Sequence, residues 1–329
     1  MKVCLYDHHN FVIPTDGIGG VIGTFQMLYE GLHKQEIDLT LIVNDLSTLE
    51  SKKKFNVIKL PYETIQDLRW GKLKVSDFFQ GDIFYSNSSG RHVNFNFDGF
   101  EGKWVSTCHG CHEYVGNSVC QVFVSNNQLS QHFKDNLFDS FCNDYRVIHN
   151  SINVDDYFWT EGSHDKLVWM GRIDGAKAER LYEIALNSKE KIYIAGWFSK
   201  ENEWLFNKIM STNNVEWLGE IKGVENKRNF YSMAKVSIHC STFEDPCPTT
   251  ILEAQSCGIP VISFANGSMS EICYHKNFIF DNLNSFTETL NNFDFKTNDE
   301  KMRDFVKVNF NSEKYSKKYL NLFESLWKK

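Results

Sequence analysis

Short apolar segments alternate with amphipathic helical patterns along nearly the whole chain, and this alternation limits the fold more than any other feature. In the first half the apolar segments are residues 3–6, 39–43, 57–60, 83–85, 104–107, 122–124 and 147–148. Between the first two, Ile22, Phe25, Leu28, Tyr29 and Leu32 repeat at steps of three and four residues, which predicts a helix with one buried face. Such alternation predicts parallel sheets covered by helices.

A second series of the same kind begins after a polar segment at residues 159–165. Its apolar segments are residues 167–170, 192–195, 215–218, 236–240, 260–264 and 278–280. A chain of 329 residues also exceeds the size at which a single core usually keeps growing. We therefore expect an α/β fold with two domains, residues 1–158 and 159–329, and a cleft at the carboxyl ends of their strands.

Charge and composition exclude several classes of protein. The net charge of −7 argues against a nucleic-acid partner, because neutralising phosphates requires clustered Lys and Arg, and the runs at 52–54, 317–318 and 328–329 are short solvated faces. The first residues reach an acid and two histidines too early for a signal peptide, and no apolar run approaches the ~20 residues that cross a bilayer. We expect a cytoplasmic protein without a transmembrane segment, whose nine cysteines are reduced and mostly buried.

Two acids, Glu244 and Asp245, follow one of the apolar segments and precede a helical pattern. Prolines on either side of Cys247 end the strand and fix the turn. Thr249 then begins the helix, and the first backbone amides of a helix bind phosphate readily. Glu253 lies one turn further along, on the face of Thr249. We interpret this stretch as part of a nucleotide-sized site.

A pair of cations follows another apolar segment, at residues 167–170. Gly171 and Arg172 come directly after it, and Lys177 follows five positions later, so both cations can converge above the end of the strand. Arg offers a forked donor and Lys a compact charge, which together suit a diphosphate whose negative charge grows as its bond to a sugar breaks. An isolated pair of this kind is more often two surface cations, and its position at a strand end favours the site.

These motifs, taken in order, resemble the retaining nucleotide-sugar glycosyltransferases of glycosyltransferase family 4. The donor domain of that family reads strand, Gly-Arg, four residues, Lys; then Ala-Gly, Leu-Gly, an acid, seven residues, Glu-Ala and Cys-Gly-x-Pro-Val. The chain shows Gly171-Arg172 and Lys177, Ala195-Gly196, Leu218-Gly219, Asp245, Glu253-Ala254, Cys257-Gly258-Ile259-Pro260-Val261, Gly267 and Glu271. Each motif is weak by itself, whereas the ordered set is specific and covers most of the chain.

The resemblance implies the GT-B fold, with two Rossmann-like domains facing a central cleft. A last helix, at about residues 313–327, would cross back toward the N-terminal domain, and its pattern does present an apolar side that needs a partner surface. The implied activity is transfer of a hexosyl or pentosyl group from a nucleoside diphosphate sugar to a hydroxyl of a saccharide or protein glycan. The anomeric configuration would be retained, and neither a metal nor a cofactor would be needed.

The resemblance also assigns roles to the cations and to one acid of the donor domain. Arg172 and Lys177, next to Gly171, would hold the donor diphosphate and stabilise it as it leaves. Glu253 would accept hydrogen bonds from the ribose of the nucleotide.

The loop before the helix departs from the family pattern. Asp245 occupies the place of the first Glu and would contact the donor sugar, but its shorter side chain leaves open whether Glu244 reaches in instead. Pro248 and Cys247 replace the usual Gly and Phe of this loop, and the backbone of Thr249 and Thr250 would bind the phosphate.

The first domain carries two further motifs of the family. Gly19 and Gly20, in the loop before the first helix, resemble the glycine loop that lets the backbone approach donor phosphate and acceptor. A dinucleotide-binding loop fits less well, because it needs glycine at the position of Ile22. His109, at the end of the segment 104–107, resembles the histidine that faces the donor sugar, and we expect it to be catalytic together with Asp245, Arg172 and Lys177.

Other interpretations of the sequence remain open. Cys108, Cys111 and His112 match the short pattern of covalent haem attachment, but the chain shows no export signal and no second ligand pair for a structural zinc. A binding protein that keeps the fold without turnover, or a sugar-nucleotide epimerase of the same fold, would also fit. We expect core or surface roles for the remaining histidines, among them His8, His9 and His239.

Overall fold

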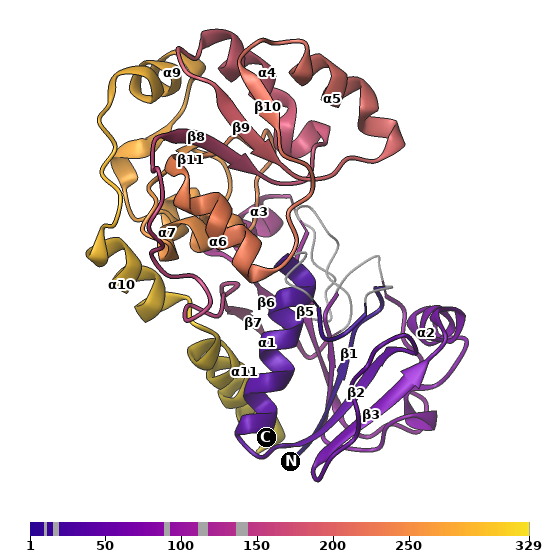
Figure 1. Cartoon of the computed structure of the whole chain (residues 1–329). Coiled ribbons are helices and arrows are strands. Elements are labelled where there is room, and N and C mark those ends of the chain that lie inside the picture. Colours follow the sequence, from indigo (N-terminus) through magenta and orange to yellow (C-terminus); the bar gives the residue numbers. More distant parts are fainter. Residues whose placement is uncertain (10–11, 16–19, 89–92, 111–117, 136–143, 329) are drawn as a thin grey trace. The chain divides into compact units, whose positions relative to one another are not determined.

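The computed structural model describes residues 1–9, 12–15, 20–88, 93–110, 118–135 and 144–328, and the chain divides into two compact units. The N-terminal unit comprises Met1–Ser151 and Ser312–Lys329, and the C-terminal unit comprises Ile152–Asn311 (Figure 1). This division precedes the boundary expected after residue 158. Residues 152–158 join the C-terminal unit because they bond to it: the amide of Ile152 donates to the carbonyl of Phe310 (3.0 Å), and Ser256 Oγ donates to the carbonyl of Tyr157 (2.7 Å).

The described part of the N-terminal unit contains a seven-stranded parallel sheet in the order β3-β2-β1-β4-β5-β6-β7. Its strands are β1 (Lys2–Tyr6), β2 (Asp38–Asn44), β3 (Phe55–Leu60), β4 (Ile83–Ser86), β5 (Lys103–Cys108), β6 (Cys120–Phe123) and β7 (Tyr145–Val147). Strands β2 and β3 follow one another on one side of β1, and strands β4 to β7 follow one another on its other side. The strand order therefore reverses between β1 and β4, which is where α/β sheets open a crevice.

Helices cover both faces of this sheet. They are α1 (Gly20–Lys34), α2 (Tyr62–Arg69), α3 (Asn126–Lys134), α11 (Ser312–Trp327) and the short 3-10 helix η1 (Val75–Asp77). Because successive side chains of a strand point to opposite faces, β1 places Val3 and Leu5 in the core under α1 and α11, and Cys4 and Tyr6 in the core under α2. The apolar sides predicted for α1 and α11 are both buried, which confirms these two helices.

The C-terminal unit contains a six-stranded parallel sheet in the order β10-β9-β8-β11-β12-β13. Its strands are β8 (Lys166–Met170), β9 (Ile192–Ala195), β10 (Val215–Trp217), β11 (Ala234–His239), β12 (Val261–Phe264) and β13 (Ile279–Phe280). Its helices are α4 (Gly175–Asn187), α5 (Glu203–Met210), α6 (Val224–Ser232), α7 (Thr249–Ser256), α8 (Met269–Ile272), α9 (Leu283–Asn292) and α10 (Glu300–Asn309), with 3-10 helices η3 (Lys200–Asn202) and η4 (Lys276–Phe278). Here the strand order reverses between β8 and β11.

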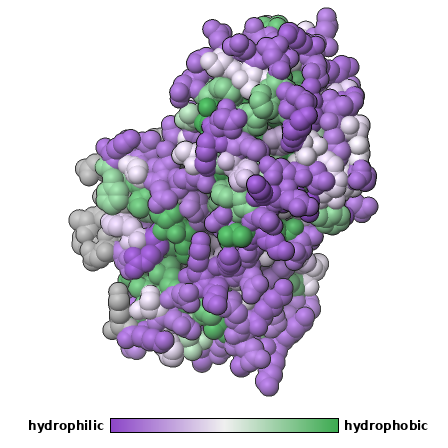
Figure 2. Space-filling model, turned by 90° about the vertical axis from the view of Figure 1, so that its left-hand side faces the viewer, coloured by the Kyte–Doolittle hydropathy of each residue, from purple (hydrophilic) through white to green (hydrophobic). Residues whose placement is uncertain are grey.

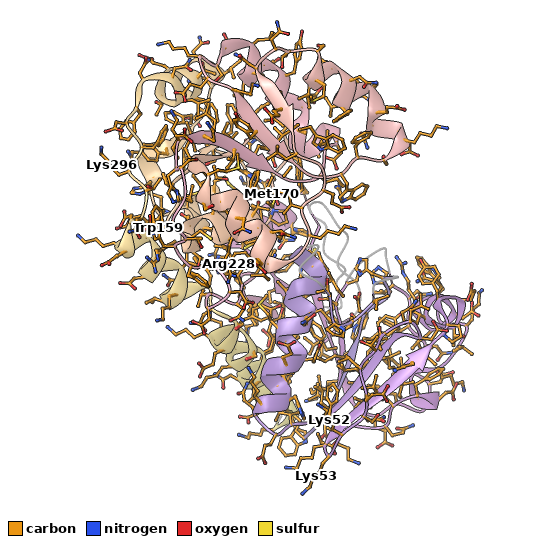
Figure 3. All side chains as sticks on the ribbon, in the orientation of Figure 1. Lys52, Lys53, Trp159, Met170, Arg228 and Lys296 are labelled. Atoms are coloured by element: carbon orange, nitrogen blue, oxygen red, sulfur yellow. The ribbon has the colours of Figure 1, made fainter. Side chains whose placement is uncertain are left out.

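The predicted fold class is confirmed, since both units are parallel sheets built by strand and helix alternation. The cysteines that the structure describes are all buried, as the sequence predicted for most of them. Lys52 and Lys53 are exposed and extend away from the ribbon, which agrees with a solvated charge run (Figure 3). The face drawn in Figure 2 is largely polar, with apolar side chains in scattered patches. Within the described residues, every helix is too short or too polar to span a membrane.

Candidate functional site

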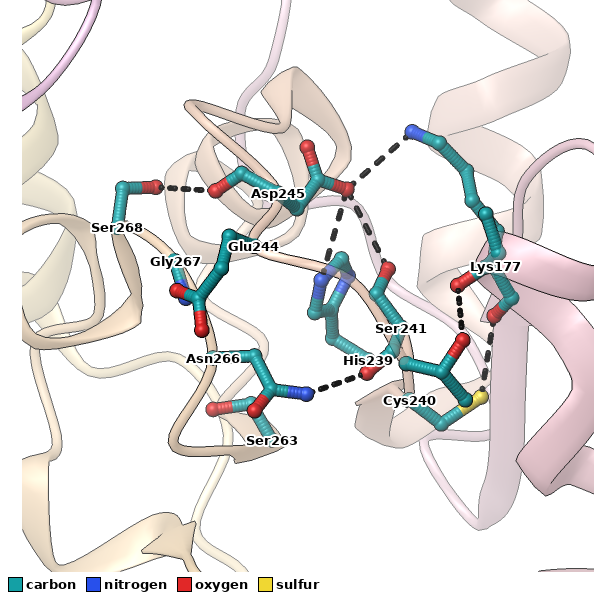
Figure 4. A network of polar contacts seen from close by, with 12 residues as sticks. Lys177, His239, Cys240, Ser241, Glu244, Asp245, Ser263, Asn266, Gly267 and Ser268 are labelled. Carbon is teal, nitrogen blue, oxygen red and sulfur yellow. Dashed lines mark hydrogen bonds and ion pairs between the residues drawn. The ribbon is translucent and has the colours of Figure 1, made fainter. Parts of the chain in front are cut away.

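Asp245 lies at the centre of a polar cluster where the strand order of the C-terminal unit reverses. Its side chain is buried, and its Oδ2 accepts hydrogen bonds from Lys177 Nζ and from Ser241 Oγ, each at 3.3 Å (Figure 4). Lys177 is in the first turn of α4, which follows β8, whereas Asp245 follows β11. Because these strands are neighbours, the structure brings together two candidate residues that are far apart in the sequence.

His239 is the residue of this cluster that the sequence analysis missed. It ends β11, and its Nε2 lies 3.8 Å from Asp245 Oδ2. Burial lowers the pKa of His239 to about 4, the charge of Asp245 opposes this shift, and Lys177 adds to it. The imidazole is therefore neutral at neutral pH. Its position as the last strand residue before the two acids was the signal that could have identified it.

Glu244 and Asp245 point to different partners. Glu244 Oε2 accepts a hydrogen bond of 2.5 Å from the backbone amide of Gly267, in the loop between β12 and α8. The backbone of Asp245 is held by the same loop, because its carbonyl accepts from the amide of Ser268 at 3.0 Å. Gly267 has φ +60°, and a side chain there would overlap the backbone of Asp245. Of the two acids, Asp245 is the one whose carboxylate contacts Lys177.

Arg172 and Lys177 occupy the same strand end but bind different acids. Arg172 Nε contacts Asp174, whose side chain also caps α4 by accepting from the amide of Lys177 at 2.9 Å. Half of the Arg172 side chain is exposed, so it can turn toward a ligand. Gly171 lies so close to Gly196, which has φ +148°, that a side chain on Gly196 would overlap the carbonyl of Gly171. The two predicted glycine motifs therefore let the ends of β8 and β9 approach each other.

Helix α7 begins at Thr249 and Thr250, directly after Pro248. Pro248 is the residue before the first turn, and its side chain makes no capping hydrogen bond to the first amides. An uncapped helix start of this kind favours an anionic ligand. The helix start lies at the carboxyl ends of the strands because α7 follows β11.

Glu253 is part of a separate, buried ion pair. Its Oε1 accepts from Lys227 Nζ at 2.8 Å, and its Oε2 lies 3.5 Å from the hydroxyl of Tyr231. Lys227 and Tyr231 belong to α6, and Lys227 is only 8% exposed. Burial raises the pKa of the Tyr231 and Tyr157 hydroxyls, and the charge of Glu253 raises both further. Lys227 was not among the residues predicted from the sequence, since a lysine on a surface helix gives no sign of being buried.

The N-terminal unit has a cavity of about 270 Å³ at the point where its own strand order reverses. Residues that follow β1, β4 and β5 line it, together with one residue of α1: His8, His9, Val21, Asn87, Ser88, His109 and Gly110. His109 Nε2 lies 2.9 Å from Asn87 Oδ1. Burial lowers the pKa of His109 to about 3, and the neighbouring His9 adds to the shift. The structure thus places the predicted His109 in a polar cavity as a neutral imidazole.

Asp7, His8 and His9 contribute a second group to this cavity region. His9 Nδ1 is 2.6 Å from Asp7 Oδ1, and the ligand-type atoms of all three residues lie within 4.8 Å of one another. Three such atoms could hold a metal ion, although the short contact shows that Asp7 is already bonded to His9. Of the remaining candidates, Gly20 begins α1, whereas Gly19, Cys111 and His112 lie outside the residues that the structure describes.

A further cavity, of about 390 Å³, lies in the C-terminal unit beside the end of β10. Leu218 of the predicted Leu-Gly motif lines it, together with Glu220, Lys222 and residues of α6 such as Asn229. Leu218 and the nearby Trp217 are partly exposed. This cavity shares no lining residue with the cavity around His109.

Residues 175–325 match the family described as "Glycosyl transferases group 1", which places that domain in the C-terminal half of the chain. Solved structures with the same fold include sucrose-phosphate synthase from Thermosynechococcus elongatus (14% identity, TM-score 0.74, 99% of both chains covered). Others are HepE from Anabaena in complex with UDP and glucose (13% identity, TM-score 0.69, 99% of this chain and 100% of that chain) and a glycosyltransferase from Rickettsia africae (16%, 0.69, 99% and 98%). No curated protein sequence gives a significant match.

The chain therefore has the GT-B fold, with two Rossmann-like domains, and its residues 175–325 are similar to the glycosyl transferases group 1. Together these findings support a glycosyltransferase.

Proposed function

We propose that the protein is a retaining glycosyltransferase that moves a sugar from a nucleoside diphosphate sugar to an acceptor hydroxyl without a metal ion. The observation that carries this proposal is the contact between Lys177 and Asp245 at the strand reversal of the domain that matches the glycosyl transferases group 1. The cation suits the diphosphate of such a donor, and the neighbouring carboxylate suits the hydroxyls of its sugar. Support comes also from HepE, a protein of the same fold that binds UDP and glucose.

In this mechanism the leaving diphosphate is the group that the C-terminal unit stabilises. Lys177 and Arg172 bind its oxygens, and the amides at the start of α7 bind the phosphate nearer to them. When the bond between the sugar C1 and the phosphate oxygen breaks, the electron pair stays on that oxygen and its negative charge increases. Cations already in place stabilise this charge without reorganising, so they lower the barrier more than they strengthen donor binding.

Asp245 and Glu253 recognise the two sugars of the donor. Lys177 can move from Asp245 to the phosphate, which leaves the Asp245 carboxylate to accept hydrogen bonds from hydroxyls of the transferred sugar. Glu253, held by Lys227 in a buried ion pair, would accept from the ribose. His109 and the glycines at Gly19 and Gly20 would serve the transferred sugar and the acceptor from the N-terminal unit.

Retention of the anomeric configuration is what the resemblance to glycosyltransferase family 4 implies. The sites proposed here contain no pair of carboxylates assigned as nucleophile and as acid and base. The acceptor oxygen would therefore bond to C1 on the face that the diphosphate leaves, and the acceptor proton would pass to the departing phosphate oxygen. One bond to C1 forms as the other breaks, the proton moves to the leaving phosphate, and no covalent bond to the enzyme is needed.

The same contacts favour one alternative, a binding protein without turnover. Lys177 with Asp245 and Lys227 with Glu253 form two ion pairs in which both acids already have partners. Such a protein would hold the nucleotide without breaking the sugar bond. A sugar-nucleotide epimerase would instead return an isomerised donor.

A screen of nucleotides and their sugars tests the proposal. Thermal unfolding with UDP, GDP and ADP, and with their glucose conjugates, identifies the base, because a ligand that binds only the native state raises its stability. Incubation with the best donor, with and without EDTA, should then release free nucleotide slowly by hydrolysis. Binding without release would favour the alternative, and loss of activity in EDTA would contradict metal independence.

A further inference from the structure

Asn87 is a buried amide that the proposed mechanism does not use. It directly follows β4, is 1% exposed, and its backbone amide donates to the carbonyl of Tyr6 at 3.0 Å. Its side-chain Oδ1 lies 2.9 Å from His109 Nε2 and 3.2 Å from the hydroxyl of Tyr85. The backbone of Asn87 is therefore held by β1, and its side-chain oxygen is held by Tyr85 of β4 and by His109, which follows β5.

Two buried polar atoms of this pair have no hydrogen bond within the part of the chain that the structure describes. They are Asn87 Nδ2 and His109 Nδ1. Both residues line the cavity of about 270 Å³. Buried donors and acceptors are nearly always paired in native proteins, so two orphan atoms in one cavity indicate a bound group that completes them.

The chemistry of the two atoms defines that group. Because Asn87 Oδ1 accepts, His109 Nε2 carries the proton, and the neutral ring presents a lone pair at Nδ1. Asn87 Nδ2 presents an N–H. One donor and one acceptor match a hydroxyl, which can accept from the amide and donate to the ring. If the amide were turned over, the two roles would be exchanged and the match would remain.

Charged groups fit this pair poorly. A carboxylate or phosphate would accept from Asn87 but would meet the lone pair of His109, and an ammonium group would meet the N–H of Asn87. Among the described residues, the other titratable groups of this cavity region are His8, which also lines the cavity, His9, which lowers the pKa of His109, and Asp7, which bonds His9. An uncharged polyol is therefore the favoured ligand class.

We propose that Asn87 and His109 together bind one hydroxyl group of a saccharide, with Asn87 both fixing the protonation of the ring and donating to the hydroxyl. Naming the hydroxyl as one of a saccharide substrate rests on the proposed function, whereas the pairing of donor and acceptor does not. Asn87 is thus assigned as a specificity-determining residue that the sequence motifs did not identify.

The first experiment reads the ring without requiring turnover. Nitrogen and proton NMR signals of the His109 ring, assigned by their loss in His109→Gln, should show a neutral ring from pH 5 to pH 8. Glucose should shift these signals, whereas acetate and inorganic phosphate at equal concentration should not. A charged ring at neutral pH, or equal shifts with the anions, would overturn the proposal.

The second experiment replaces the amide by its isosteric acid. In Asn87→Asp the carboxylate still accepts from Nε2, and its negative charge favours the protonated ring, so the ring should become charged within pH 5 to 8. The carboxylate also has no N–H to offer to the hydroxyl. The KM for the saccharide should rise about tenfold, with a smaller change in kcat. Asn56→Asp, at an exposed position of β3, adds the same charge and should change neither quantity.

Binding and folding controls separate the possible failures. The thermal shift produced by the nucleotide, which the C-terminal unit binds, should be unchanged in Asn87→Asp if the protein remains folded. Turnover with wild-type KM in this folded variant would refute the hydroxyl pair and leave the proposed function standing. Glucose-dependent shifts of the His109 signals in a protein that never releases nucleotide would refute the proposed function and support the pair.

Discussion

Lys177 and Asp245 are separated by 68 residues in the sequence and by 3.3 Å between Nζ and Oδ2. Asp245 is almost completely buried, while Lys177 keeps about a third of its side chain exposed. This asymmetry lets the acid hold the cation at the strand end while the cation remains accessible to a ligand. The position of Lys177 is further fixed by Asp174, which caps the first turn of α4.

Replacing Lys177 by Ala should slow turnover far more than it weakens nucleotide binding. Removing a charge that acts mainly on the leaving phosphate is expected to cost about 3 kcal/mol in the transition state, or roughly a hundredfold in kcat. Initial rates with the best donor measure this change. Lys191→Ala removes an exposed lysine, paired with Glu216 on the same unit, and serves as the control. Undiminished kcat in Lys177→Ala would refute the role of this residue.

At the scale of elements, the contact between α1 and α11 is closer than ordinary helix packing allows for most residues. Gly31 of α1 faces Ser316 of α11, and any side chain on Gly31 would overlap both Cβ and Oγ of Ser316. Gly23, two turns earlier in α1, has open space around the position that a Cβ would take. The two glycines therefore have different reasons to be glycine, although both lie in the same helix.

Substitution by Ala should affect the two positions in opposite directions. Gly31→Ala forces the helices apart and is expected to lower the free energy of unfolding of the N-terminal unit by about 1–3 kcal/mol. Gly23→Ala should raise it by up to about 1 kcal/mol, because Ala loses less backbone entropy in a helix. Urea unfolding measures both. Ser316→Gly should restore part of the loss in Gly31→Ala, and no restoration would show that the overlap is elsewhere.

For the whole molecule, acid should destabilise both units through buried imidazoles. Burial lowers the pKa of His109 to about 3 and that of His239 to about 4, whereas an unfolded histidine titrates near ~6.5. Below pH ~6.5 the unfolded chain binds protons that the folded chain does not, so the free energy of unfolding falls as pH falls toward the folded pKa. The contribution of the two neutral imidazoles to the free energy of unfolding is fully present above pH ~6.5.

Urea unfolding at pH 7.5 and pH 5 measures this loss. Each imidazole should contribute a decrease of about 2 kcal/mol between the two conditions. His239→Gln removes the contribution of the C-terminal unit and should make its transition less sensitive to pH. An equal decrease in the variant would mean that other groups cause the acid sensitivity.

Much of the fold could be predicted because local residue patterns indicate the helices and strands of this chain. The positions Ile22, Phe25 and Leu28 needed only helical spacing to predict a buried face, and the strands needed only short apolar runs between turns. The candidate residues Lys177 and Asp245 could be found in the same way, since each follows a predicted strand. Local patterns also predicted an apolar side on the last helix without identifying the surface that it covers.

The sequence by itself determined the alternation of strands and helices, the polar positions at strand ends and, through these local patterns, the α/β fold class. Only the tertiary structure decided that Lys227 is buried against Glu253, that His239 lies beside Asp245, and that Asn87 bonds His109. These contacts join segments whose neighbours are set by the order of strands in each sheet. That order depends on packing over the whole unit, so no local pattern of residues can specify it.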